Sequence, residues 1–155
     1  MNISYMNIRQ FSGTYLPNDD RIIFRFNTTD QSEYKFWLTR KVTQFILGSA
    51  SKFFEQQHNK QAPSFEKIIS EFQQSPEEGK SNFLEEYQSG SKYPLGAESI
   101  LVIDARCQIT NIDNQEIFSV DFILPGGANV NLKLPMDNMQ KMVLLLEQLN
   151  TQAKW

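Results

Sequence analysis

The residue types that most often carry catalysis are few in this sequence of 155 residues. Ser49 and Lys52 have the Ser-x-x-Lys spacing of serine acyl enzymes, but the partner motifs Ser-Asp-Asn and Lys-Thr-Gly are absent. Ser64 and Lys67 have the same spacing, which shows how readily it arises by chance. We therefore expect no catalytic residue of this kind.

Metal and cofactor chemistry is not indicated either. A metal site needs a cluster of ligands such as His and Cys. His58 and Cys107 are the only residues of their types, and they are far apart in the sequence. Gly126-Gly127 lacks the Lys-Ser/Thr that follows in a phosphate-binding loop and is typical of a hairpin turn. The sequence predicts no metal, no cofactor and no disulfide.

One group of residues has the chemistry of a binding surface. Alternation along the chain places Arg25, Lys35 and Trp37 on one face of a predicted sheet, opposite an apolar face. A tryptophan beside two cations can stack a nucleobase or dock a protein partner. The alternative is that another part of the chain covers this face, which would make Trp37 part of a second core layer.

Two strands and a helix must position these three residues. Apolar residues alternate with others over 22–27 and 34–39, and the polar stretch 28–32 is suited to a hairpin loop. Thr39 is a suitable cap for a helix that begins near residue 40. A weaker strand is expected over residues 2–10.

The pattern recurs at a shift of 96 residues. The recurrence predicts strands over 118–122 and 130–134, after a strand over 99–109, and Pro135 suits the start of a closing helix. We therefore predict an α+β fold of two antiparallel strand-then-helix halves, residues 1–54 and 99–155. The alternative is that any two hairpins followed by helices can be aligned in this way.

An acidic insert, residues 55–98, separates the halves. It holds four basic and eight acidic residues, whereas residues 1–54 hold seven and four. Short helices are predicted near 64–72 and 82–87. The length of the whole chain fits one domain, residues 1–155.

The closing helix has more apolar residues than one core face needs. Leu144 and Leu145 lie off its main stripe, so we predict a homodimer that uses this helix, the outward sheet face, or both. The competing explanation is that the insert helix packs over one of these apolar surfaces within the same chain. Its apolar residues are Phe65, Ile68, Ile69 and Phe72.

Composition limits the partners and the location. The net charge of −3 and the pI of about 5.2 disfavour a general polyanion binder. No apolar run approaches a membrane span or a signal peptide, so we expect a cytoplasmic protein without a membrane partner.

The order of several strands and then a helix, repeated once, resembles the topology of the PUR and Whirly single-strand nucleic-acid-binding domains. This resemblance implies a nucleic-acid partner on the sheet face with Arg25, Lys35 and Trp37. The acidic pI and the insert count against it, so the leading prediction is a non-enzymatic binding or adaptor module that binds itself or another protein. The third hypothesis is an enzyme with an unfamiliar site.

Overall fold

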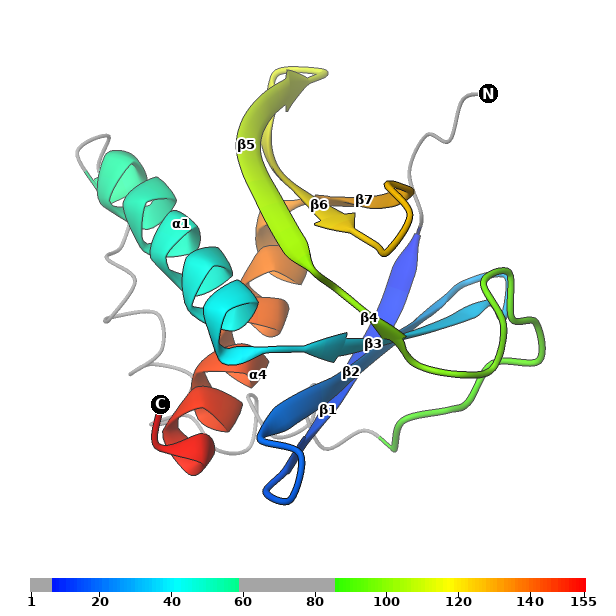
Figure 1. Ribbon diagram of the computed structural model, residues 1–155. Helices are drawn as coiled ribbons and strands as arrows, with labels where there is room; N and C mark the ends of the chain where they lie inside the picture. Colours follow the sequence, from blue (N-terminus) through cyan, green and yellow to red (C-terminus); the bar gives the residue numbers. More distant parts are fainter. Residues whose placement is uncertain (1–6, 59–85) are drawn as a thin grey trace.

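The computed structural model describes residues 7–58 and 86–155. These residues form an α+β fold of two sheets and two long helices (Figure 1). In chain order the elements are β1 (Ile8–Leu16), β2 (Arg21–Thr28), β3 (Glu33–Leu38), α1 (Arg40–His58), β4 (Ile100–Leu101), β5 (Asp104–Ile112), β6 (Gln115–Ile123), β7 (Asn129–Leu134) and α4 (Met136–Ala153). The helix predicted near 64–72, and most of the one predicted at 82–87, lie outside the described residues.

The first sheet has the order β1-β2-β3-β4. Strands β2 and β3 form the predicted antiparallel hairpin, with Phe24 opposite Phe36. Strand β1 pairs with β2 up to Leu16, so it ends later than the strand expected over residues 2–10. Strand β4 is short and pairs in parallel with β3, at Phe36 and Trp37.

The second sheet has the order β5-β6-β7 and is antiparallel throughout. The predicted hairpin of β6 and β7 is present, with Val120 opposite Leu132. Asp113 and Asn114, with φ of 50° and 64°, connect β5 to β6 in a two-residue turn. Such turns favour Asn and Asp because both central residues need positive φ.

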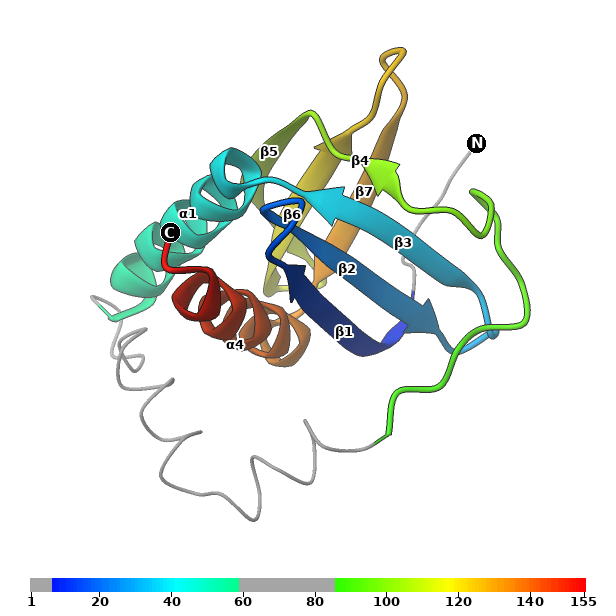
Figure 2. The ribbon, with the colours of Figure 1, turned by 60° about the horizontal axis from the view of Figure 1, so that its bottom comes forward.

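Helices α1 and α4 lie side by side against the sheets (Figure 2). The predicted cap is confirmed, because the Thr39 hydroxyl accepts a hydrogen bond of 3.3 Å from the main-chain N–H of Val42. Helix α1 continues to His58, beyond the expected limit of the first half at residue 54. Gly13 lets α4 approach β1, since a Cβ at this position would lie 2.6 Å from Leu149 Cδ1.

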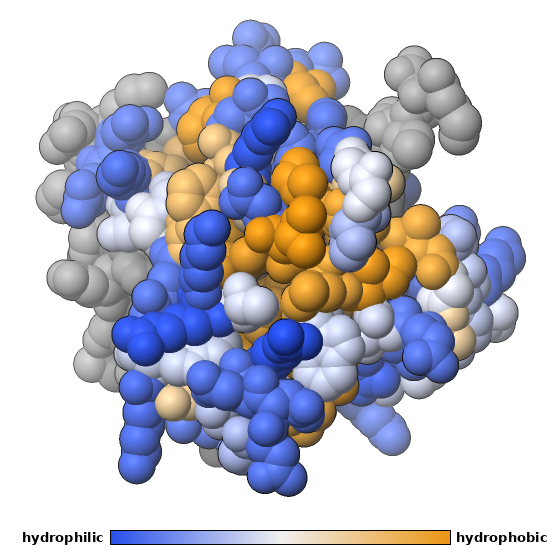
Figure 3. Space-filling model, in the orientation of Figure 1, coloured by the Kyte–Doolittle hydropathy of each residue, from blue (hydrophilic) through white to orange (hydrophobic). Residues whose placement is uncertain are grey.

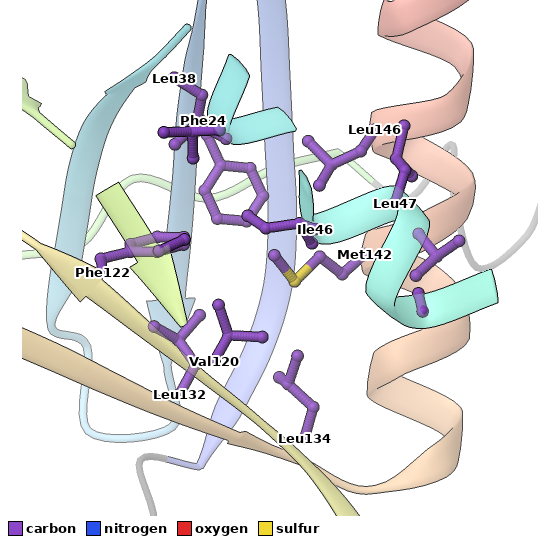
Figure 4. Packing of buried hydrophobic residues seen from close by; sticks show 14 of the residues in the cluster. Phe24, Leu38, Ile46, Leu47, Val120, Phe122, Leu132, Leu134, Met142 and Leu146 are labelled. Carbon is purple, nitrogen blue, oxygen red and sulfur yellow. The ribbon is translucent and has the colours of Figure 1, made fainter. Parts of the chain in front are cut away.

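The core lies where the inner faces of both sheets meet the two helices (Figure 4). Phe122 of β6 joins the sheets, because its ring centroid lies 5.0 Å from that of Phe36 and 6.2 Å from that of Phe24. Helix α1 contributes Ile46 and α4 contributes Met142, both fully buried.

Alternation over the strand predicted at 99–109 places Ile103 and Ile109 on its inward face, and this part of the prediction is wrong. Ile103 and Ile109 keep 48% and 39% of their surface exposed. Strand β5 is the edge of the second sheet, and the β5–β6 hairpin curves away from the helices at its tip (Figure 1). Alternation alone did not indicate at which residue of this strand the inward side chains cease to be buried.

No helix within the described ranges is long and apolar enough to cross a membrane.

Candidate binding face

The three predicted surface residues lie together on the first sheet. Arg25 of β2 is directly opposite Lys35 of β3, and Trp37 is two residue pairs further along, opposite Ile23. All three are partly buried and point away from the core side that Phe24 and its neighbours occupy. We call this side of the first sheet the outer face. The sequence therefore predicted correctly that these side chains share one side of the hairpin.

Part of the outer face is covered by a segment of the same chain, residues 86–93, which we call the strap. Figure 2 shows the chain passing the end of the β2–β3 hairpin and returning along the edge of β3 to β4. Main-chain hydrogen bonds hold the strap there. The N–H groups of Ser91 and Lys92 donate to the Gln31 carbonyl at 2.9 and 3.0 Å, and the N–H of Glu33 donates to the Lys92 carbonyl at 2.8 Å.

Arg25 and Lys35 of the outer face each contact a tyrosine of this segment. The guanidinium carbon of Arg25 lies 4.4 Å from the centre of the Tyr87 ring. The ammonium nitrogen of Lys35 lies 5.6 Å from the centre of the Tyr93 ring. These distances are those of cation–π contacts, which stabilise partly exposed sites by about 0.5–1 kcal/mol each. The strap thus contacts the same two cations that the sequence singled out.

A fully buried carboxylate, Glu33, lies between the strap and the sheet. Its oxygens accept hydrogen bonds from the Tyr87 hydroxyl at 2.8 Å and from the Gly90 N–H at 3.3 Å. An Arg25 guanidinium nitrogen lies 3.7 Å away and supplies the balancing charge. Burial and the hydrogen bond to Glu33 raise the pKa of Tyr87, so its hydroxyl stays protonated and acts as a donor.

Sequence reasoning missed Glu33, Tyr87 and Gly90. Glu33 alternates in phase with Lys35 and Trp37, so its position on the outer face was available from the pattern. The burial of Glu33 could not be predicted from the pattern, because the residues that bury it belong to a segment far along the chain. No local signal in residues 86–93 predicts pairing with this hairpin.

The leucines expected at a dimer interface already pack within the chain. Leu144 is buried, at 4% exposure, and Leu145 is partly buried against the core. A Cβ placed on Gly13 would lie 3.5 Å from Leu145 Cδ2, so this leucine faces β1. The apolar surplus that the sequence assigned to this helix is therefore largely covered in the single chain.

Two described side chains with nucleophilic potential, Ser49 and Cys107, lie within hydrogen-bonding distance of each other. Ser49 and Lys52 lie on α1. Burial raises the pKa of Cys107 to about 11, although a hydrogen bond with Ser49 partly opposes the shift. A thiol with this pKa remains protonated and weakly reactive at neutral pH. Within residues 7–58 and 86–155 no cluster of three or more His, Cys, Asp or Glu side chains is placed to hold a metal.

The outward side of the second sheet carries a polar network. The Asn131 amide donates to Ser119 Oγ at 2.8 Å and to Asp121 Oδ1 at 2.6 Å, and the Lys133 ammonium donates to Asn131 Oδ1 at 2.8 Å. These groups satisfy one another across β6 and β7, so the network is explained by the sheet itself.

Comparison of the chain with protein-family models, with curated proteins and with solved structures gave no match.

Proposed function

We propose that this chain is a non-enzymatic binding module that holds an extended segment of a partner protein on the outer face of the first sheet. The observation that carries the proposal is the strap. The strap pairs its main chain with Gln31 and Glu33 at the edge of the hairpin. Its tyrosines contact Arg25 and Lys35 on the outer face. Main-chain pairing gives such recognition its affinity, and pockets for side chains give it specificity.

The partner would use the part of the face beside the strap. Trp37 is partly exposed there, with Lys35 two residues before it on the same strand and Ile23 opposite. Tryptophan is among the residues that contribute most to protein interfaces. Its position between a cation and an aliphatic side chain suits an extended segment with alternating acidic and apolar residues.

A peptide array tests this function. We expect the wild-type protein to bind a subset of extended peptides with acidic and apolar residues, and Trp37→Ala to weaken that binding at least tenfold. Trp155→Ala is the matched control, because Trp155 packs on Tyr15 at the other side of the sheet and should leave binding unchanged. Failure of the wild-type protein to bind any peptide, or equal binding by Trp37→Ala, would reject the proposal.

A second candidate function is binding of single-stranded nucleic acid, as the resemblance to PUR and Whirly domains implies. The favouring observation is that two cations, Arg25 and Lys35, share a sheet face with Trp37 and with the exposed ring of Tyr93. A mixed-sequence oligonucleotide in the same assay separates the candidates, because nucleic-acid binding falls steeply as salt is raised.

We also propose that the two strand-then-helix halves are a structural repeat. The pairing of Phe24 with Phe36 in the first hairpin corresponds, at the shift of 96, to the pairing of Val120 with Leu132 in the second. The helix follows directly in each half, at Arg40 and at Met136.

The homodimer remains a prediction, and exposed apolar residues suggest a different surface for it. Phe45 of α1 and Ile103 are each 48% exposed. Figure 3 shows apolar side chains gathered at the centre of the face that carries β4 and the start of β5. Light scattering should give twice the chain mass of 18.0 kDa. Ile103→Glu should restore the monomer without unfolding it, whereas Leu145→Glu should destabilise the fold.

A monomeric mass at every concentration would end the dimer hypothesis. A dimer that persists in Ile103→Glu would move the interface away from this surface.

A further inference from the structure

The strap is held almost entirely by polar and main-chain contacts. At its start, the Asn27 amide donates to the Gln88 carbonyl at 2.6 Å, and the Gln88 N–H donates to Gln10 Oε1 at 3.0 Å. Further along the strap, the Lys92 N–H donates to the Gln31 carbonyl, and the Lys92 carbonyl accepts from the Glu33 N–H. Another extended polypeptide can supply every one of these bonds.

Little apolar surface is buried by the strap itself. Tyr87 and Gly90 are partly buried, whereas the remaining residues of the strap are exposed. Segments with few buried apolar contacts open at a lower free energy than the surrounding core. The contacts of the strap are therefore local and separable from the core described above.

The fit at one point depends on the absence of a side chain. A Cβ on Gly90 would lie 2.7 Å from the Gln31 carbonyl oxygen, 2.8 Å from Glu33 Cβ and 2.9 Å from Glu33 N. Two of these atoms belong to the main chain of the hairpin, so a side chain here cannot be accommodated by a rotamer change. A substitution at Gly90 thus acts on strap closure and not on the core.

We propose that the strap is an internal ligand of the outer face, which opens and competes with the partner segment for Arg25, Lys35 and Glu33. This inference rests on the proposed function, since it assigns the regulation of that same site. The strap is part of the same chain, so its effective concentration at the site is high. A segment of another protein can contact Arg25, Lys35 and Glu33 together only after the strap has left them. When the strap has left, apolar residues of that partner segment occupy the places of Tyr87 and Tyr93 over Arg25 and Lys35, where an aromatic side chain fits best.

The strap sequence itself is the probe. A fluorescent synthetic peptide of residues 86–93 is titrated into the full-length wild-type protein and into Gly90→Val. We expect at least tenfold tighter binding to Gly90→Val, because its own strap no longer fills the site. Ser89→Val is the matched control, since residue 89 is an exposed neighbour on the strap and its change should leave the strap closed.

Two further measurements assign the binding to the outer face. A peptide with alanine in place of Tyr87 and Tyr93 should lose its affinity for Gly90→Val, and so should the intact peptide when Arg25→Ala is added to that variant. Hydrogen exchange at the amides of Glu33 and Lys92 reports opening of the strap independently of any ligand.

Faster exchange in Gly90→Val without a gain in peptide binding would overturn the inference, because the strap would then be a fixed part of the fold. If Gly90→Val does not fold or does not open, Tyr87→Ala combined with Tyr93→Ala weakens the strap without a clash, and the same comparison applies. An array peptide that binds the wild-type protein and the opened variant equally would reject competition by the strap while leaving the proposed function standing.

Discussion

Replacement of Phe122 by alanine is expected to lower the free energy of unfolding by about 3–5 kcal/mol, the range for large aromatic residues in cores. Phe122 is fully buried, and its ring contacts Phe24 and Phe36 of the other sheet edge-on. The change therefore removes contacts between the two sheets and leaves a cavity between them. Urea denaturation of the purified protein measures the loss.

Ile109→Ala is the matched control for Phe122→Ala. Ile109 belongs to the neighbouring strand of the same sheet, but 39% of its surface is exposed. Its truncation should cost less than about 1 kcal/mol, as is usual for exposed positions. Similar losses in the two variants would contradict the assignment of Phe122 to the junction between the sheets.

The second large effect is expected at Glu33. Glu33→Ala should destabilise the closed strap by about 2–4 kcal/mol relative to the open one, because a buried donor that loses its acceptor costs about 1–3 kcal/mol. Two donors lose their acceptor in this variant, the Tyr87 hydroxyl and the Gly90 N–H. Arg25 remains partly solvated and can hydrate its charge. Hydrogen exchange at the Lys92 amide, which donates to the Gln31 carbonyl when the strap is closed, should become faster and measures the loss.

Glu33→Gln separates hydrogen bonding from charge. The amide oxygen can still accept a hydrogen bond from Tyr87 or Gly90, so the loss should be clearly smaller than in Glu33→Ala. An equal loss in both variants would show that the charge beside Arg25, and not the hydrogen bonds, stabilises the closed strap.

The hairpins were predictable because a one-residue slip would move every apolar side chain to the wrong face. Phe24 and Phe36 on one hairpin, and Val120 and Leu132 on the other, each have alternating neighbours that allow only one register. The same alternation placed Arg25, Lys35 and Trp37 on one side. Local signals also sufficed for the cap at Thr39.

The rest of the site depends on contacts that alternation does not encode. The strap reaches Glu33 through main-chain groups and single polar atoms, and any exposed Gly or Tyr could make such contacts at many positions. The burial of Leu144 likewise depends on where α4 packs, and helical periodicity gives only the direction of a side chain. The exposure of Ile103 follows from its place just before an edge strand.

The short parallel pairing of β4 with β3 has a consequence for folding. The edge of β3 is completed by residues that come late in the chain, because Lys92 binds Glu33 and the N–H of Val102 donates to the Trp37 carbonyl at 3.0 Å. Until that segment has been synthesised, β3 presents unpaired N–H and C=O groups, which is the kind of edge that promotes aggregation. Such non-local pairing is also slow to form. The first sheet and the second half of the chain are therefore interdependent in folding, although each has its own hairpin and helix.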